Sequence, residues 1–145
     1  MKIIVLAGGL STERDVSLSS AAGICRTLLE KGHDAYLLDV FMGLENPPEN
    51  LEDVFTLPGH GLEIAKNIGT EEPDLEAVKA SRPDQSNCFL GPNVIELCRM
   101  ADITFLGLHG GEGENGKLQA TFDLLGIRYT GPDSLGCAVA MDKGF

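Results

Sequence analysis

The sequence has few basic residues and no long hydrophobic run. It holds 11 basic residues against 22 acidic ones, which gives a formal net charge of −11. Proteins that bind nucleic acids or anionic membrane surfaces need a basic face, so this composition argues against both partners. No apolar stretch approaches the ~20 residues that span a bilayer. The opening run Ile3–Ala7 is also too short for a signal peptide, because it meets glycine at once.

The sequence also lacks cysteine motifs. None of the four cysteines forms a CxxC pair, and none has histidine at zinc-ligand spacing. Cys25, Cys98 and Cys137 stand among apolar residues, so we expect reduced thiols in a cytoplasmic protein. What is present is ordinary for one globular domain: 145 residues, of which 43% are hydrophobic and 23% charged.

Residues 2–40 follow a strand–helix–strand pattern. Lys2–Ala7 is a continuous apolar run rich in β-branched residues, which predicts a strand buried on both faces of a parallel sheet. A helix capped by Asp15 and ended before Gly32 is expected next, followed by a strand over Ala35–Val40. The apolar stripe of the expected helix consists of Leu18, Ala21, Ala22, Cys25, Leu28 and Leu29. These patterns predict an α/β fold, an open and mostly parallel sheet with flanking helices.

The middle of the chain, at about 43–93, has a different composition. It contains ten acidic and three basic residues, together with six of the seven prolines. Two short helical patterns are present, Leu62–Ile68 and Asp74–Ser81. A stretch this rich in charge is more often a solvated surface than an acidic partner-binding segment. We therefore expect a surface excursion with partial structure.

Regular patterns return after this excursion. Asn93 is expected to cap a short helix, and a glycine-rich loop is expected over His109–Gly116. Leu118, Thr121, Phe122 and Leu125 should face inward from the helix after that loop. The expected elements are helix Val94–Met100, strand Ile103–Leu108, helix Lys117–Leu125, strand Ile127–Thr130 and helix Ser134–Met141. The chain stops at Phe145 without a polar linker, which indicates part of a longer protein.

Two glycine-rich loops follow predicted strands, and such loops form the ligand crevice of open α/β sheets. In the first, Glu13 lies near a helix start that keeps its carboxylate ionised and ready to bind an ammonium group. In the second, His109 directly follows a strand. By residue type alone, a helix cap for Glu13, a structural role for His109 and a solvated Lys143 are the more common outcomes. The pattern predicts a domain that binds a small charged metabolite.

The first loop does not have the spacing of known nucleotide-binding motifs. It has only two glycines, Gly8 and Gly9, so the GxGxxG dinucleotide fingerprint fails. It also lacks the GxxxxGK[ST] pattern of a P-loop. The residues alone therefore leave the reaction open.

Four motifs, in order, resemble the D-alanine–D-alanine ligase family. They are Gly8-Gly-Leu-Ser-Thr-Glu-Arg-Asp-Val-Ser-Leu18, Leu108-His-Gly-Gly-Glu-Gly-Glu-Asn-Gly-Lys-Leu-Gln-Ala120, Leu124-Leu-Gly-Ile-Arg-Tyr-Thr-Gly131 and Ala138-Val-Ala-Met-Asp-Lys143. The match covers residues 2–40 and about 93–145, with Asp15 and Asn115 as mild variants. The middle of the chain matches no pattern of that family.

The resemblance implies a Rossmann-like domain that precedes an ATP-grasp body. Enzymes of this family join two D-alanines for peptidoglycan synthesis, with ATP and Mg²⁺ as cofactors. The first D-alanine carboxylate attacks the γ-phosphate of ATP, and the amine of the second D-alanine displaces phosphate from the acyl phosphate. The resemblance also implies a cytoplasmic homodimer. The ATP-grasp body is expected beyond residue 145, so the chain alone should be inactive, and phosphate release by the purified chain would contradict this.

The resemblance also implies a role for particular residues. Glu13 would hold the ammonium group of the first D-alanine, and His109 would lie beside its carboxylate. Val16 would pack against its methyl group. The remaining implied site residues are Ser17 and Gly110 at the substrate and Lys143 at an ATP phosphate.

Two other functions stay open. One is a non-catalytic module that binds a small metabolite. The other is a ligase that makes D-alanyl-D-lactate or D-alanyl-D-serine, because the residues that select the second substrate are expected mostly outside this chain.

Overall fold

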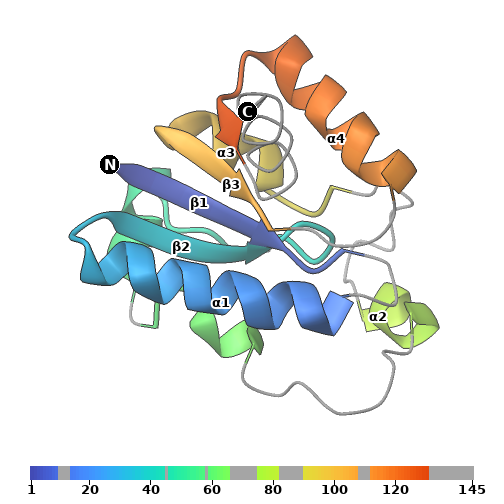
Figure 1. Ribbon diagram of the computed structural model, residues 1–145, viewed down its shortest axis with the longest axis horizontal. Helices are drawn as coiled ribbons and strands as arrows, with labels where there is room; N and C mark the ends of the chain where they lie inside the picture. The colour runs from blue at the N-terminus through green and yellow to red at the C-terminus, as the bar shows by residue number, and fades with distance from the viewer. Residues whose placement is uncertain are drawn as a thin grey trace, which may run out of the picture.

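The computed structural model describes residues 1–9, 14–44, 46–57, 59–65, 75–81, 90–107 and 112–130. Within these residues, four strands form one sheet in the order β2-β1-β3-β4, and every neighbouring pair is parallel (Figure 1). The strands are β1 (Lys2–Ala7), β2 (Asp34–Asp39), β3 (Ile103–Leu106) and β4 (Tyr129–Thr130). The predicted α/β fold with a parallel sheet is confirmed.

The central strand β1 explains the continuous apolar run at the start of the sequence. It pairs with β2 on one side and β3 on the other, and residues 3–7 are all buried. Successive side chains of a strand point to opposite faces. Ile4 and Leu6 therefore enter one hydrophobic cluster, while Ile3, Val5 and Ala7 enter the other. Both faces of the sheet are covered, which requires apolar residues at every position of β1.

Helix α1 (Arg14–Glu30) covers one face of the sheet (Figure 1). Its predicted stripe is confirmed, since four of the six residues are buried in the cluster on that face and Leu28 and Leu29 pack against it. Gly32 has a φ of +89° and follows the helix as predicted. The cap prediction for Asp15 is wrong. The helix begins at Arg14, so Asp15 lies inside the first turn. Its negative charge still interacts favourably with the helix dipole there.

Helices α3 (Val94–Met100) and α4 (Glu112–Leu125) contribute to the other face. Leu118 and Phe122 of α4 are buried as predicted, but Leu125 is 37% exposed and the prediction for it is wrong. Helix α4 also begins five residues before the predicted Lys117, so part of the expected glycine-rich loop is helical. Glycine costs a helix only about 1 kcal/mol per residue relative to alanine, and burial of Phe122 against the sheet offsets this.

Asn93 does not cap α3, contrary to the prediction. Its backbone is left-handed, with a φ of 65°, and its side chain makes no hydrogen bond to the helix. Its Nδ2 instead donates to the carbonyl oxygen of Leu44, at 2.8 Å. The amide therefore joins the start of α3 to the chain that leaves β2.

The acidic middle is structured in part. It contributes two 3-10 helices, η1 (Leu51–Thr56) and η2 (Leu62–Ala65), and helix α2 (Leu75–Ser81). Helix α2 falls within the predicted pattern Asp74–Ser81, and η2 covers the first four residues of the predicted pattern Leu62–Ile68, the rest of which lies outside the described residues. However, Val54 and Phe55 of η1 are buried in the core, so the excursion does not lie wholly on the surface. The expected helix Ser134–Met141 lies outside the described residues.

Residues 59–61 lie against the outer edge of β2. The backbone N–H of Leu37 donates to the carbonyl oxygen of His60, at 2.9 Å. A Cβ atom on Gly61 would lie 2.1 Å from the carbonyl oxygen of Leu37, and Gly61 has a φ of +76°. Only glycine fits this approach.

In the part of the chain that the structure describes, no helix is long and apolar enough to cross a membrane.

Candidate functional site

The candidate site lies where the chain leaves β1 and β3 toward opposite faces of the sheet. After β1 the chain enters α1 on one face, and after β3 it enters α4, whose core residues belong to the cluster on the other face. In open α/β sheets, ligands bind outside the carboxyl ends of the strands at such a switch point. Both glycine-rich motif loops begin here, the first at Gly8 and the second just after Gly107.

Ser17 joins the two loops at the switch point. Its hydroxyl accepts a hydrogen bond from the backbone N–H of Gly8, at 3.0 Å, and donates to the carbonyl oxygen of Gly107, at 2.6 Å. The residue is fully buried. Both hydrogen bonds go to backbone groups, so this side chain sets the separation of the two loops. The arrangement suits it better to positioning them than to direct contact with a substrate.

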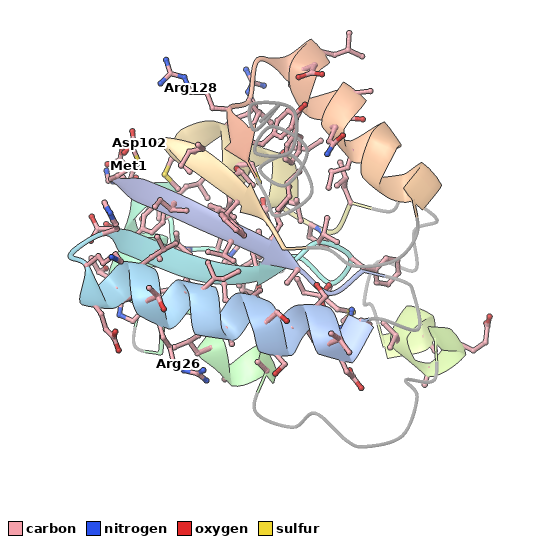
Figure 2. The ribbon with its side chains drawn as sticks, in the orientation of Figure 1. Met1, Arg26, Asp102 and Arg128 are labelled. Carbon is pink, nitrogen blue, oxygen red and sulfur yellow. The ribbon has the colours of Figure 1, made fainter. Side chains whose placement is uncertain are left out.

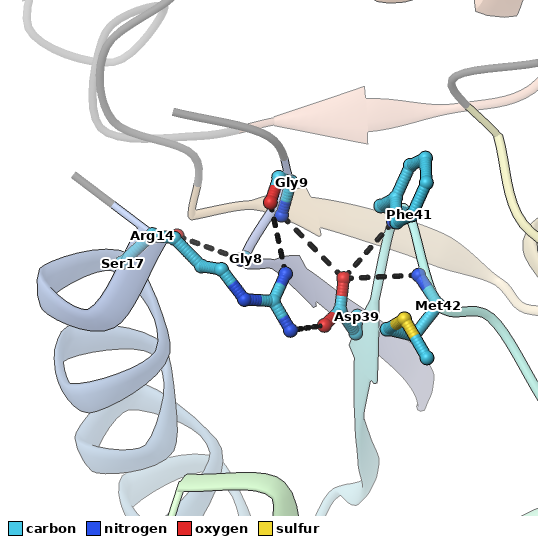
Figure 3. A network of polar contacts seen from close by, with 7 residues as sticks. All are labelled: Gly8, Gly9, Arg14, Ser17, Asp39, Phe41 and Met42. Carbon is cyan, nitrogen blue, oxygen red and sulfur yellow. Dashed lines mark hydrogen bonds and ion pairs between the residues drawn. The ribbon is translucent and has the colours of Figure 1, made fainter. Parts of the chain in front are cut away.

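Asp39 and Arg14 form a second polar connection at the same edge (Figure 3). Asp39 ends β2, and one of its oxygens, Oδ2, pairs with Nη2 of Arg14. The other oxygen, Oδ1, accepts from the backbone N–H groups of Phe41 and Met42, at 3.0 and 3.2 Å, and more weakly from that of Gly9, at 3.4 Å. Nη1 of Arg14 donates to the carbonyl oxygen of Gly9, at 2.8 Å. The ion pair is largely removed from water, since the two side chains are 12% and 4% exposed.

The first motif glycine is required by this pair. Gly8 has a φ of +80°, which favours glycine. A Cβ atom at this position would lie 2.8 Å from Oδ1 of Asp39 and 3.1 Å from Nη1 of Arg14. The glycine therefore provides the space in which the ion pair reaches the loop.

Asp39 was missed by the sequence analysis. In dinucleotide-binding domains, the acid near the end of the second strand binds a ribose hydroxyl. Asp39 occupies the corresponding place, but both of its oxygens are taken by groups of this chain. Together with the absent third glycine, this argues against a dinucleotide site. The available signal was an acid directly after the apolar run Ala35–Leu38.

The structure describes some of the predicted site residues and does not describe the others. Val16 lies in the first turn of α1 and is 52% exposed, so its apolar side chain is accessible at this end of the helix. Glu13, His109, Gly110 and Lys143 lie outside the described residues. Their neighbours in the chain are informative, because Arg14 directly follows Glu13 and Gly107 precedes His109 by two residues. Ser17 and the Arg14–Asp39 pair bring those neighbours to one edge.

A cavity of about 280 Å³ lies at the opposite end of the sheet, between the starts of β3 and β4. Arg99, Asp102 and Arg128 contribute to its lining, and Figure 2 shows Asp102 and Arg128 at this end of the sheet. Because it faces away from the carboxyl ends of the strands, we do not assign the substrate to it. Among the described residues, no three His, Cys, Asp or Glu side chains are grouped so as to hold a metal ion.

Comparison with known proteins identifies the family. The sequence profile of a family described as "D-ala D-ala ligase N-terminus" matches residues 2–132. The chain belongs to the D-alanine–D-alanine ligase family. The profile spans both glycine-rich motifs and also the acidic middle. The sequence motifs alone had indicated no resemblance to the family in that middle part.

Individual relatives agree with this assignment. The chain is 46% identical over its whole length to a D-alanine–D-alanine ligase of Lacticaseibacillus casei, and 48% identical over 99% of its length to that of Pediococcus pentosaceus. The ligase of Leptospira interrogans is 36% identical over 98% of the chain. The chain spans about 40% of the length of the first two relatives and 37% of the third. It corresponds to the amino-terminal part of a ligase of this family.

Proposed function

We propose that the protein to which this chain belongs joins two D-alanine molecules in an ATP-dependent reaction that serves peptidoglycan synthesis. In this proposal, the present domain binds the first D-alanine. Family membership supports the reaction, and the relatives are named for it. The observation that carries the site is the Ser17 hydroxyl, which holds the starts of both motif loops at one switch point.

The proposed residues are assigned to separate groups of the substrate. Glu13 supplies an anion for the ammonium group, and its place just before α1 favours the ionised carboxylate. His109 and Gly110 would lie by the substrate carboxylate. Val16, exposed on the first turn of α1, offers apolar contact to the methyl group. Ser17 would act on the substrate through the two loops that it joins.

The cofactors are proposed at the level of the whole protein. Lys143 is the residue of this chain proposed to reach an ATP phosphate. The described residues offer no ligand set for Mg²⁺, so we derive no reaction step through the metal. We also propose that the whole protein is a homodimer and that it lies in the cytoplasm. The free and buried thiols of Cys25 and Cys98 support the cytoplasmic location. Burial raises the pKa of the Cys25 thiol to about 11, which keeps it protonated. Light scattering of the full-length protein tests the dimer.

Replacement of Glu13 tests the site. Calorimetry of the full-length protein with Glu13→Gln should show D-alanine binding weakened by about 2–4 kcal/mol, because the ammonium group loses its charged partner. Glu30→Gln is a matched control, since Glu30 is exposed at the far end of α1. Unchanged D-alanine binding in Glu13→Gln would remove this residue from the site.

A further inference from the structure

Arg14 follows Glu13 in the chain, yet its side chain turns back toward the sheet. Its guanidinium reaches two groups on different segments, the carboxylate of Asp39 at the end of β2 and the carbonyl oxygen of Gly9 after β1 (Figure 3). The planar guanidinium suits this task because it presents several donors in a fixed geometry. One side chain therefore connects the beginning of α1 with the ends of two strands.

Gly9 and Arg14 stand on either side of positions 10–13 in the chain, and hydrogen bonds hold both of these residues. Gly9 is held through its carbonyl oxygen by Arg14 and through its N–H by Asp39. Asp39 is itself held by the backbone N–H groups of Phe41 and Met42. Gly9, Arg14 and Asp39 therefore form one hydrogen-bonded frame, and in the sequence Glu13 stands between its members Gly9 and Arg14.

Stability alone does not account for this frame. Removing two charges from water is costly, and a well-packed apolar pair is often as stable as a buried ion pair. The frame contacts the backbone at the start of the ligand loop, whereas Leu37 and Leu38 of the same strand pack in the hydrophobic core. Its hydrogen bonds fix backbone positions, which an apolar pair would not do.

We propose that Arg14 and Asp39 are positioning residues that hold Glu13 ready for the ammonium group of the first D-alanine. This inference rests on the proposed function. A side chain displaced by even an ångström loses much of its effect on a bound substrate. In this proposal the frame affects D-alanine binding only through Glu13, in addition to any contribution that it makes to stability.

Steady-state kinetics of the full-length ligase test the proposal. Arg14→Met keeps much of the side-chain volume and removes the charge and the donors. We expect the KM for the first D-alanine to rise about tenfold, with kcat and the KM for ATP changed by no more than about threefold. Arg14→Lys retains the charge without the fork of donors, so its KM should lie between those of Arg14→Met and the unaltered protein.

A double-mutant cycle decides whether Arg14 acts through Glu13. If it does, adding Arg14→Met to Glu13→Gln should change the KM for D-alanine by less than about twofold. Independent, additive effects would overturn the proposal. An unchanged KM in Arg14→Met alongside a raised KM in Glu13→Gln would also overturn it and leave the proposed function intact. An unchanged KM in Glu13→Gln would instead contradict the proposed function.

The surface pair of Lys2 and Glu52 provides the control. It joins the amino end of β1 to η1, and its side chains are 35% and 55% exposed. Lys2→Met should leave both KM values unchanged. Thermal unfolding of each variant identifies any that fail to fold, in which case Arg14→Lys carries the cycle with Glu13→Gln.

Discussion

The two ends of β1 each lie beside one ion pair, and the two pairs differ in their access to water. At the carboxyl end, Arg14 and Asp39 are 12% and 4% exposed. At the amino end, Lys2 and Glu52 lie 3.1 Å apart but are 35% and 55% exposed. Water screens the second pair and is largely excluded from the first.

The hydrogen bonds around the pairs differ as well. At the carboxyl end, the pair and Ser17 bind backbone groups of the loops that begin there. At the amino end, Asp102 accepts the backbone N–H of Lys2 at an exposed position, and Figure 2 shows Asp102 beside the start of the chain. Burial and hydrogen bonds to the backbone, more than the presence of an ion pair, therefore mark the end of the sheet at which loop geometry is controlled.

The largest expected effect comes from cutting the buried pair. Asp39→Ala leaves the Arg14 guanidinium largely buried without its anion, which should destabilise the chain by about 3–5 kcal/mol. Urea unfolding followed by circular dichroism measures this change. A loss below about 1 kcal/mol would place the pair in the same class as the exposed one.

The Ser17 hydroxyl, which joins the two loops, should have a smaller effect on the free energy of unfolding. Ser17→Ala leaves the N–H of Gly8 and the carbonyl of Gly107 without their shared partner, at a cost of about 1–3 kcal/mol. Thr27→Ala is the matched control in the same helix, because Thr27 also donates to a backbone carbonyl, that of Gly23, but at an exposed position. Equal losses in urea unfolding for the two variants would contradict the importance of burial.

Cys98 shows what burial does to a titratable group that forms no ion pair. It is as deeply buried as Asp39, and burial raises the pKa of its thiol from 9.0 to about 12. Because the thiol is protonated more readily in the folded chain, its stabilisation is present below pH 9 and is lost as the pH rises toward 12. Between pH 8 and pH 10, the free energy of unfolding should fall by about 1 kcal/mol more in the unaltered chain than in Cys98→Ala. Parallel pH profiles would refute this.

The exposed pair should have the smallest effect. Glu52→Ala is expected to change the free energy of unfolding by no more than about 0.5 kcal/mol, and added salt should abolish the difference. Urea unfolding at low and high ionic strength measures both. A loss of several kcal/mol would remove the contrast between the two ends.

Local patterns made much of the fold predictable. The continuous apolar run of β1 and the helical periodicity of α1 are both local signals, and the structure confirms both. The start of α4 was predicted wrongly because glycine content favoured a loop, while packing of Phe122 on the sheet favoured a helix. The left-handed backbone of Asn93 depends on its contact with Leu44, which is distant in the sequence.

The places where the two glycine-rich loops begin were predictable, but the contacts that connect them were not. The glycine-rich loops after predicted strands indicated the switch point, where the structure places Gly8 and Gly107. The role of Ser17 depends on Gly107, 90 positions away, and that of Asp39 depends on Arg14, 25 positions away. No local pattern in one sequence encodes such pairings. The roles of Glu13 and His109 remain predictions.

The segment at Gly59–Gly61 has a consequence for how this protein can assemble. By occupying the backbone donor of Leu37 and approaching its carbonyl oxygen, the segment blocks the middle of the outer β2 edge. An unprotected edge strand is a template on which a second chain can add a strand. Because the middle of this edge is blocked, a strand of a second chain is not expected to extend the sheet across β2.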